Sequence, residues 1–438
     1  MTIEVGKFPR ENYSLYVLSV LVVVYIFTYI NRTILVLLVD PIKLTLGISD
    51  TELSILHGFA FAIFYTFLGI PMGWLADRGN RIKIIRLSTY VWSLAAILTG
   101  ACNSFLQMFF ARVGLGIGTS ALSPAVYSLL SDYFRSEKLS KALSFYNTGL
   151  FIGSGLALVI AGFLIDLTPG INLPLIGYLE PWRVTFIIVG LPGIILAIWL
   201  TTIPEPQRLG FGSEKSDKNS LVSYLNMAVS YIRERPKAYL YHFCGFSFYA
   251  FIWAGTAAWI PSHFIRNFQW SPSEVGSSYG LLVIIFGLLG VMSGGFVCGK
   301  LRENGFKDAE VRTGLIGILF TLPFGVISPL LSNPYLALFS FAGLTFFASF
   351  PWGAATAALQ IITPNRLRAI ISGFFLFIIN MAGVGIAPTI IALITDFVFG
   401  YDAAVKYSLS IAVGIAAPIS ALLLWLGLNP YRKVIEEI

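Results

Sequence analysis

Long uninterrupted apolar stretches constrain this chain more than any other feature of its sequence. Each runs for about 20 residues or more, which is enough for a helix to cross the ~30 Å hydrocarbon core of a bilayer. Charged residues make up only 12 % of the chain, whereas a soluble protein usually carries about 25 %. The sequence therefore predicts an all-α polytopic membrane protein and argues against a soluble enzyme, a nucleic-acid binder and a disulfide scaffold.

Twelve stretches have the length and hydropathy of a spanning helix. The predicted spans are residues 14–38, 53–76, 82–103, 105–131, 138–166, 182–203, 237–264, 274–299, 310–331, 335–361, 367–396 and 402–428. Of the 29 Lys and Arg residues, 23 fall in one set of loops; the opposite set holds Lys43, Arg183, Arg266 and Lys406, and Arg32 and Arg112 lie inside spans. Because basic loops stay on the cytoplasmic side, we expect both termini in the cytoplasm, with the protein in a bacterial inner membrane.

The longest polar connection divides the spans into two sets of six. It runs from Pro204 to Pro236, and its most polar part, residues 210–220, predicts a hydrated cytoplasmic hinge. Residues 153–166 of the fifth span align without gaps onto 383–396 of the eleventh, as the internal repeats of transporters do. We therefore expect a six-helix bundle over residues 1–203, a linker over 204–236 and a second, pseudo-symmetric six-helix bundle over 237–438.

The loop after the second span carries the motif Gly-x-x-x-Asp-Arg-x-x-Arg-x-Lys, from Gly73 to Lys83. A glycine at position 73 allows another helix to approach closely, and Asp77 is placed to pair with a base or to cap a helix. Lys138 and Arg368, which are related by the spacing of the internal repeat, lie in two other loops of the same side. The residues expected to act in conformational change are Gly73, Asp77, Arg78, Arg81, Lys138 and Arg368.

Two arginines lie well inside predicted spans, and no carboxylate does. Arg112 is about 7 residues into the fourth span, or some 10 Å deep at 1.5 Å per residue, and Arg32 lies in the outer third of the first. A charge at such depth costs several kcal/mol unless it faces protein or water, and a guanidinium group matches a carboxylate or a phosphate. The pair suggests a site for an anionic group. The alternative is that each arginine binds helix-end carbonyls or extends back to the surface. Glycine at every second position from Gly114 to Gly118 predicts close packing or a bend in this span.

These features resemble those of the major facilitator superfamily, whose loop signature is the motif from Gly73 to Lys83; a degraded copy runs from Gly295 to Arg302, with Gly299 in place of the acid. Other stretches resemble the spinster-type branch of that family and its bacterial relatives. They are Asn31-Arg32, Arg112 to Ser120, Trp182-Arg183, Glu205-Pro206, Trp259-Ile-Pro261 with Arg266, Glu274-Val-Gly276, Pro364 to Arg368 and Asn380 to Pro388. The resemblance implies the major facilitator fold of two six-helix bundles and secondary transport by alternating access.

Two departures from that branch concern proton coupling. Its members typically have aspartate at the position of Asn31 and glutamate at that of Thr119, and those acids are thought to respond to protons. An amide and a hydroxyl do not titrate, so the resemblance implies coupling that is weaker than the family norm or carried elsewhere. His57 is the remaining titratable candidate in the amino-terminal half, with a packing role as the alternative.

The sequence thus predicts a secondary transporter rather than an enzyme, without a cofactor or a metal, since the three cysteines have unrelated spacing and no ATP-binding motif is present. The expected substrate is a small organic anion, such as a sugar acid or an aromatic acid. A lysophospholipid-like amphiphile is the alternative, and a non-transporting receptor of the same fold is the second. The protein is expected to be a monomer in the lipid bilayer. The side chains expected to bind substrate are Arg112, Arg32, Asn31, Thr119, Asn147, Tyr146, His57 and Asn380, beside mid-span aromatic residues Tyr29, Tyr65, Tyr249, Trp253, Trp352 and Phe374.

Overall fold

The computed structural model describes residues 9–168, 170–173, 177–208, 221–364 and 367–437. Within these residues, twelve helical segments are long and apolar enough to cross a membrane. The prediction of an all-α protein with twelve spans is therefore confirmed. The chain divides into two units, one of Met1–Ser216 with Ser271–Leu281 and one of Asp217–Trp270 with Leu282–Ile438.

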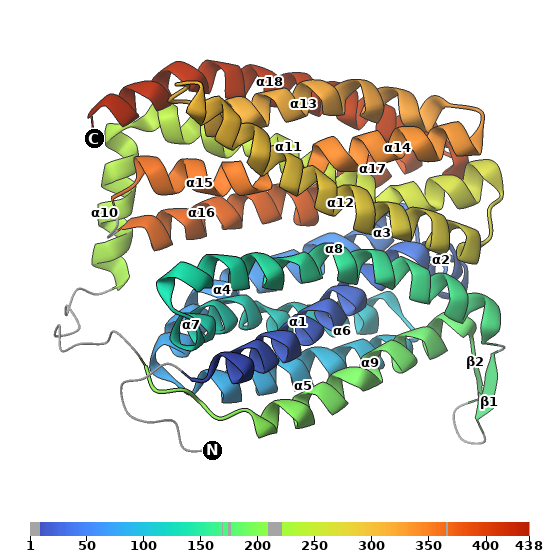
Figure 1. Cartoon of the computed structure of the whole chain (residues 1–438). Helices are drawn as coiled ribbons and strands as arrows, with labels where there is room; N and C mark the ends of the chain where they lie inside the picture. Colours follow the sequence, from blue (N-terminus) through green and yellow to red (C-terminus); the bar gives the residue numbers. More distant parts are fainter. Residues whose placement is uncertain (1–8, 169, 174–176, 209–220, 365–366, 438) are drawn as a thin grey trace. The chain divides into compact units, whose positions relative to one another are not determined.

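The first unit contains the first six spans (Figure 1). Its helices are α1 (Glu11–Thr33), α2 (Val39–Leu46), α3 (Asp50–Ser54), α4 (Ala60–Arg78), α5 (Arg81–Gly100), α6 (Phe105–Ser120), α7 (Leu122–Tyr133), α8 (Ser136–Leu167) and α9 (Pro181–Trp199). Short 3₁₀ segments follow α1 (Ile34–Leu37) and α9 (Leu200–Thr202), and a π-helical turn, Ile55–Phe59, joins α3 to α4. Between α8 and α9, the strands β1 (Ile171–Leu173) and β2 (Gly177–Leu179) pair antiparallel as a hairpin that the sequence did not predict.

The second unit contains the other six spans, apart from the part of the eighth span up to Leu281, which belongs to the first unit. Its helices are α10 (Leu221–Glu234), α11 (Pro236–Phe268), α12 (Pro272–Glu303), α13 (Ala309–Ile327), α14 (Pro334–Ser349), α15 (Trp352–Ile362), α16 (Arg368–Asn380), α17 (Ala387–Leu393) and α18 (Val405–Glu437). The π-helical segments Met381–Ile386 and Ile394–Phe399 flank α17, and 3₁₀ turns lie at Ser328–Leu330 and Asp402–Ala404. The long helices α11 and α18 pack along each other, and α13 packs on α18.

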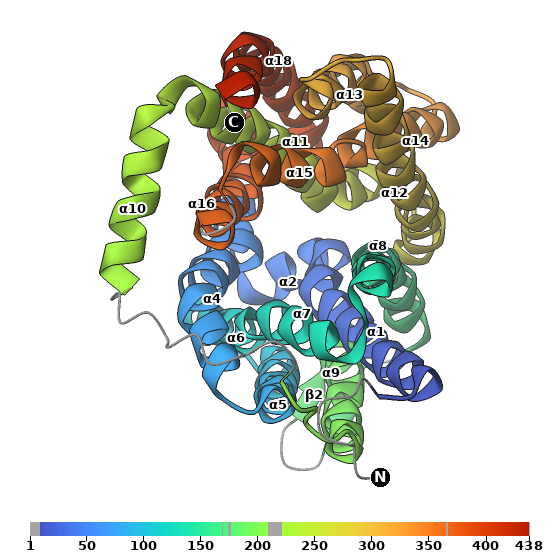
Figure 2. The same cartoon turned by 60° about the vertical axis from the view of Figure 1, so that its left-hand side comes forward.

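Two parts of the second unit differ from the sequence prediction. Residues 204–236 were predicted to be a linker, yet residues 221–234 of it form α10, which runs across the direction of α11, α15 and α16 in both views (Figures 1 and 2). The most polar part of that linker, residues 210–220, lies outside the described residues. The last span was predicted to end at residue 428, but α18 continues to Glu437 through Pro430. The proline supplies no N–H, so this helix forgoes one backbone hydrogen bond there.

Three helices of the first unit meet almost backbone to backbone. A Cβ atom added at Gly116 of α6 would lie 2.6 Å from the carbonyl oxygen of Phe61 in α4. At Gly118 it would lie 2.6 Å from the backbone nitrogen of Trp92 in α5, and the Ser88 hydroxyl of α5 donates to the Gly118 carbonyl. Small residues permit such approach in membranes, where packing holds helices together. Close packing is therefore the reason for the alternating glycines, whereas a Cβ at Gly114 would meet only Ala95 at 3.4 Å.

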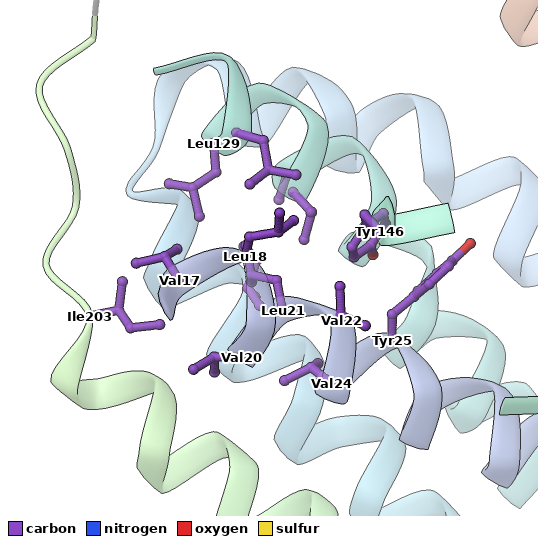
Figure 3. Close-up of a cluster of buried hydrophobic side chains, with 14 of the residues drawn as sticks. Val17, Leu18, Val20, Leu21, Val22, Val24, Tyr25, Leu129, Tyr146 and Ile203 are labelled. Carbon is purple, nitrogen blue, oxygen red and sulfur yellow. The ribbon is translucent and has the colours of Figure 1, made fainter. Parts of the chain in front are cut away.

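A buried apolar cluster centres on α1 (Figure 3). Val17, Leu18 and Leu21 of α1 lie against Leu129 of α7, among a larger buried set from α5, α7, α8 and the segment after α9. Tyr25 of α1 and Tyr146 of α8 stack at the edge of this cluster, with ring centroids 4.2 Å apart. The cluster fixes the position of α1, which carries Asn31 and Arg32.

Candidate functional site

Arg112 is buried inside the first unit, with 1 % of its surface exposed. Its terminal nitrogens donate over 3.5 Å each to the backbone carbonyls of Asn31 and Arg32, at the carboxyl end of α1. A helix carboxyl end carries partial negative charge, which favours a cation there. The Nε atom of Arg112 has no partner. Arg112 therefore supports the end of α1, as in the alternative reading of this residue, while keeping one buried donor uncommitted.

Arg32 lies between that buried position and the surface of the unit. Its guanidinium carbon is 4.5 Å from the ring centroid of Phe61, 5.4 Å from that of Tyr29 and 5.8 Å from that of Tyr65. Within the described part of the chain, the guanidinium has no hydrogen bond and no carboxylate partner. Arg32 is half-buried, so its charge is only partly solvated. It is a cation enclosed by aromatic rings with its N–H donors free for a ligand.

Asn31 and Thr119 are the positions where the sequence departs from the acids of the spinster-type branch. Asn31 is fully buried and donates from Nδ2 to the carbonyls of Phe27 and Val189, over 2.9 and 3.3 Å, while its Oδ1 has no partner. The Thr119 hydroxyl donates to the carbonyls of Leu115 and Gly116 in its own helix. Both side chains satisfy backbone groups rather than project into open space.

His57 lies in the π-helical turn before α4, within electrostatic range of both Arg112 and Arg32. Its Nδ1 atom is buried without a hydrogen-bond partner. The structure thus brings Arg32, Arg112, Asn31 and His57 together at the junction of α1, the π-helical turn and α6. Three of the four carry a buried polar atom without a partner, which is uncommon in native proteins.

A group of tyrosines continues from Arg32 toward α7 and α8. Tyr29 is edge-on to Tyr25, with centroids 5.0 Å apart, and Tyr127 of α7 is edge-on to Tyr146 at 5.9 Å. The Tyr127 hydroxyl donates to Oδ1 of Asn147 over 2.9 Å. Tyr127 is 40 % exposed and Asn147 is also exposed, although both lie well inside their spans. Because hydroxyl and amide groups are costly to place in hydrocarbon wherever one of their hydrogen bonds is not made, this face is better suited to water or to a ligand than to lipid.

Asn380 belongs to the second unit, at the carboxyl end of α16, where it donates to the Leu376 carbonyl in its own helix over 2.8 Å. The same unit holds a mid-span aromatic group in which Trp352 is edge-on to both Tyr249 and Trp253. The indole nitrogen of Trp352 has no partner. Across the described residues, no group of three or more His, Cys, Asp or Glu side chains is placed to hold a metal ion.

The loop motif forms a buried ion cluster at one end of the first unit. Arg81 is 1 % exposed and bonds Asp132 of α7 over 2.5 Å and Glu205 over 2.7 Å. Glu205 also accepts from the backbone nitrogen of Ile82 over 3.0 Å, and Arg208 donates to the carbonyls of Ala76 and Gly79. The loop motif predicts a role for Arg81, whereas no motif marks Asp132 or Arg208, because the residues that they contact are distant in the chain.

Four of the other residues expected to act in conformational change have described contacts. The side chain of Asp77 lies outside the described part of the chain. A Cβ atom at Gly73 would lie 3.7 Å from Cβ of Pro124, which is an ordinary van der Waals contact. Arg78 stacks over Trp74 at 4.1 Å. Lys138 pairs with Glu11 of α1 over 2.6 Å, and Arg368 donates to the Thr363 carbonyl.

Known proteins are similar to this chain over nearly its whole length. An MFS-type efflux pump of Mycolicibacterium smegmatis is 26 % identical over 98 % of this chain and 96 % of its own length. A probable L-galactonate transporter of Escherichia coli is 23 % identical over 85 % of this chain and 81 % of its own length, and spinster homolog 1 of Xenopus laevis is 24 % identical over 88 % and 74 %. The crystal structure of a bacterial homolog of the human lysosomal transporter spinster superposes with a TM-score of 0.78 at 24 % identity, covering 98 % of both chains.

A family model described as Major Facilitator Superfamily matches residues 21–388 of this chain. That stretch includes the Gly73 to Lys83 motif, both membrane-embedded arginines and most of the twelve spans. The chain therefore belongs to the major facilitator superfamily and is an integral membrane secondary transporter, not an enzyme.

Proposed function

We propose that the protein transports a small organic anion by alternating access, and that Arg32 binds the anionic group of the substrate. The observation that supports this most directly is the state of the Arg32 guanidinium, which lies in a span, faces three aromatic rings and has no partner in the described part of the chain. An uncompensated cation in a membrane is costly. A bound carboxylate or phosphate would repay that cost through two parallel N–H···O bonds.

Arg112 acts beneath Arg32 in this proposal. Its bonds to the carbonyls of Asn31 and Arg32 hold the end of α1, and its positive charge adds to the local potential that attracts an anion. Asn31 bonds this end of the helix to the Val189 carbonyl of α9, whereas Tyr127 and its hydrogen-bonded partner Asn147 lie on the exposed face that would meet the body of the substrate. The name of the Escherichia coli relative, which refers to a sugar acid, supports an anion as the substrate class.

Proton coupling through the positions of Asn31 and Thr119 is absent from this proposal. Both side chains are already hydrogen-bonded to backbone carbonyls, and neither titrates. Transport would then depend on the substrate gradient, on exchange, or on a titratable group elsewhere. In the proposed orientation, the end of the first unit that carries Arg81 faces the cytoplasm, because basic residues concentrate there.

A lysophospholipid-like amphiphile is the second candidate. The exposed aromatic face around Tyr127 would accept an acyl chain, and the spinster relatives support a link with that branch. An amphiphile bound mainly by its chain would depend less on Arg32 than a small acid does.

The test is a thermal-shift screen of the purified protein with sugar acids, aromatic acids and lysolipids, followed by flux measurements in liposomes. A ligand at 100 times its dissociation constant stabilises the folded state by about 2.7 kcal/mol. Arg32→Gln is expected to abolish both the shift and the flux for a small acid. Arg10→Gln removes an exposed guanidinium at the start of the same helix and is expected to change neither.

Lysolipids that stabilise the wild type and Arg32→Gln equally, with no response to any acid, would contradict the anion site and favour the amphiphile. A small acid that binds in an Arg32-dependent way but is never moved across the membrane would instead indicate a receptor.

A further inference from the structure

We infer that the transported anion carries an aromatic ring, so that the substrate is an aryl carboxylate rather than a sugar acid. This inference rests on the proposed function, because it takes Arg32 as the partner of the anionic group. The inference also assigns a role in binding to the tyrosine group of the first unit, which consists of Tyr25, Tyr29, Tyr65, Tyr127 and Tyr146.

Aromatic rings surround the Arg32 guanidinium on the sides where a ligand would bind. Three ring centroids, of Phe61, Tyr29 and Tyr65, lie within 5.8 Å of its guanidinium carbon. Phe61 and Tyr65 are themselves stacked, with centroids 5.2 Å apart. A carboxylate bound to Arg32 would therefore place the atoms attached to it against ring faces and edges rather than against polar side chains.

A series of aromatic contacts, which passes through the buried rings of Tyr25 and Tyr146, links Tyr29 to the exposed ring of Tyr127. Tyr29 contacts Tyr25, Tyr25 stacks on Tyr146 at 4.2 Å, and Tyr146 meets the edge of Tyr127. These contacts mix stacked and edge-on geometry, the two arrangements that aromatic pairs prefer. Because Tyr127 is 40 % exposed, an arene could add one further ring to the series at that end.

Apart from the phenol hydroxyls of the tyrosines, the same surroundings offer few side-chain oxygens to sugar hydroxyls. The side-chain oxygen of Asn147 already accepts from Tyr127, and the Thr119 hydroxyl is bound to its own helix. Asn31 has an unpaired oxygen, but that residue is fully buried. A sugar acid has several hydroxyl groups, each of which loses hydrogen bonds to water on binding and needs a replacement. An aryl acid has only its carboxylate to satisfy, which Arg32 does.

Four monoanions separate the two classes: benzoate, phenylacetate, cyclohexanecarboxylate and gluconate. Cyclohexanecarboxylate matches benzoate in charge and in ring size but has no π system. We expect benzoate or phenylacetate to bind the purified full-length protein at least about threefold more tightly than cyclohexanecarboxylate, on the scale of one aromatic pair, and gluconate to bind more weakly still. Binding would be measured by calorimetry in detergent.

The tyrosine group is tested with a pair of variants. Tyr127→Leu removes the exposed ring and is expected to weaken aryl acid binding by about three- to tenfold while leaving cyclohexanecarboxylate binding unchanged. Tyr127→Phe keeps the ring, loses only the hydroxyl bonded to Asn147, and is expected to bind aryl acids like the wild type. Because Tyr127 is partly exposed, neither change empties the core, and unchanged melting temperatures without ligand would show that both variants fold.

Gluconate binding that depends on Arg32, with no binding of aryl acids, would overturn the aromatic assignment and leave the proposed anion transporter standing. Equal affinity for benzoate and cyclohexanecarboxylate would also overturn it. If none of the four acids binds in an Arg32-dependent way, the proposed function itself fails and the inference falls with it.

Discussion

Arg81 and Asp132 form an ion pair inside the first unit, with 2.5 Å between Nη1 and Oδ2 and less than 6 % of either side chain exposed. They are joined by Glu205, which bonds Nε of the same guanidinium and the backbone of the next residue. One buried cation therefore connects the start of α5, the end of α7 and the chain that leaves α9. The loop motif owes its structural role to these partners.

Replacing Arg81 by glutamine is expected to destabilise the protein strongly. The change removes a buried cation from Asp132 and Glu205, and breaking a buried pair from one side typically costs about 3–5 kcal/mol. The measurement is the melting temperature of the purified variant in detergent. Lys138→Gln is the control, because its pair with Glu11 is more than half exposed on both sides and an exposed pair contributes roughly 0–1 kcal/mol. A similar shift in both variants would contradict a special role for burial.

The two membrane-embedded arginines are expected to respond differently to the loss of charge. Arg32→Gln removes a cation that has no described partner and lies near another cation, so the melting temperature without ligand is expected to stay the same or rise. Arg112→Gln removes two contacts to the end of α1 from a buried position and is expected to lower it. A larger fall in melting temperature for Arg32→Gln than for Arg112→Gln, measured without ligand, would contradict this prediction, because it would show that Arg32 stabilises the fold.

The alternating glycines of α6 are expected to tolerate alanine unequally. Gly116→Ala and Gly118→Ala would each place a Cβ 2.6 Å from a backbone atom of a neighbouring helix, which forces helices apart and costs typically 1–3 kcal/mol. Gly73→Ala, with its nearest neighbour at 3.7 Å, is the matched control and is expected to be close to neutral for stability. Comparable expression and melting temperature for all three variants would show that α6 can shift to accommodate the methyl groups.

A buried acid in the second unit gives a test independent of transport. Glu310, at the start of α13, is 2 % exposed and pairs with Arg302 of α12. Arg302→Gln is expected to lower the melting temperature, because it leaves the Glu310 carboxylate without that cation. Lys300→Gln, two positions earlier, breaks only the exposed pair with Glu303 and is expected to have no measurable effect. Equal melting temperatures would mean that the Tyr431 hydroxyl, 3.5 Å from Glu310, or water is sufficient to stabilise the carboxylate.

Introducing an acid beside Arg112 is expected to make transport more dependent on pH. Asn31→Asp places a carboxylate where the amide now lies, next to the carbonyls that Arg112 contacts. Transport by this variant is expected to change with external pH, whereas transport by Asn31→Gln, the uncharged control, is expected to remain insensitive. The measurement is substrate flux in liposomes at a series of pH values. A strong pH dependence already present in the wild type would show that another group carries protons.

Much of the fold could be predicted because lipid imposes a simple rule on the sequence. A span must be helical and apolar over a fixed length, so twelve spans could be counted and the depth of Arg112 could be read from its place in the fourth. The partners of Arg81 could not be found in this way. Asp132 and Glu205 lie 51 and 124 positions away along the chain, and nothing local marks them as its ligands.

The hairpin β1–β2 and helix α10 escaped prediction for another reason. Both lie in connections between spans, where the length and hydropathy that identify a span say little about local structure. The orientation of side chains within a span was equally hidden. Thr119 and Asn31 are predicted to bind the substrate, and nothing in the sequence pattern shows that Asn31 also donates to the Val189 carbonyl of another helix, because a uniformly apolar span does not encode the rotation of a helix about its axis.

The contacts at Gly116 and Gly118 also have a consequence for distance measurements on this protein. Because α6 touches the backbones of α4 and α5 directly, there is no layer of flexible side chains between these helices that could change its packing as the transporter works. Pairs of spectroscopic labels on exposed positions of α5 and α6 are therefore expected to report a constant separation with and without substrate. Such a pair supplies an internal standard against which real movements elsewhere in the molecule can be calibrated.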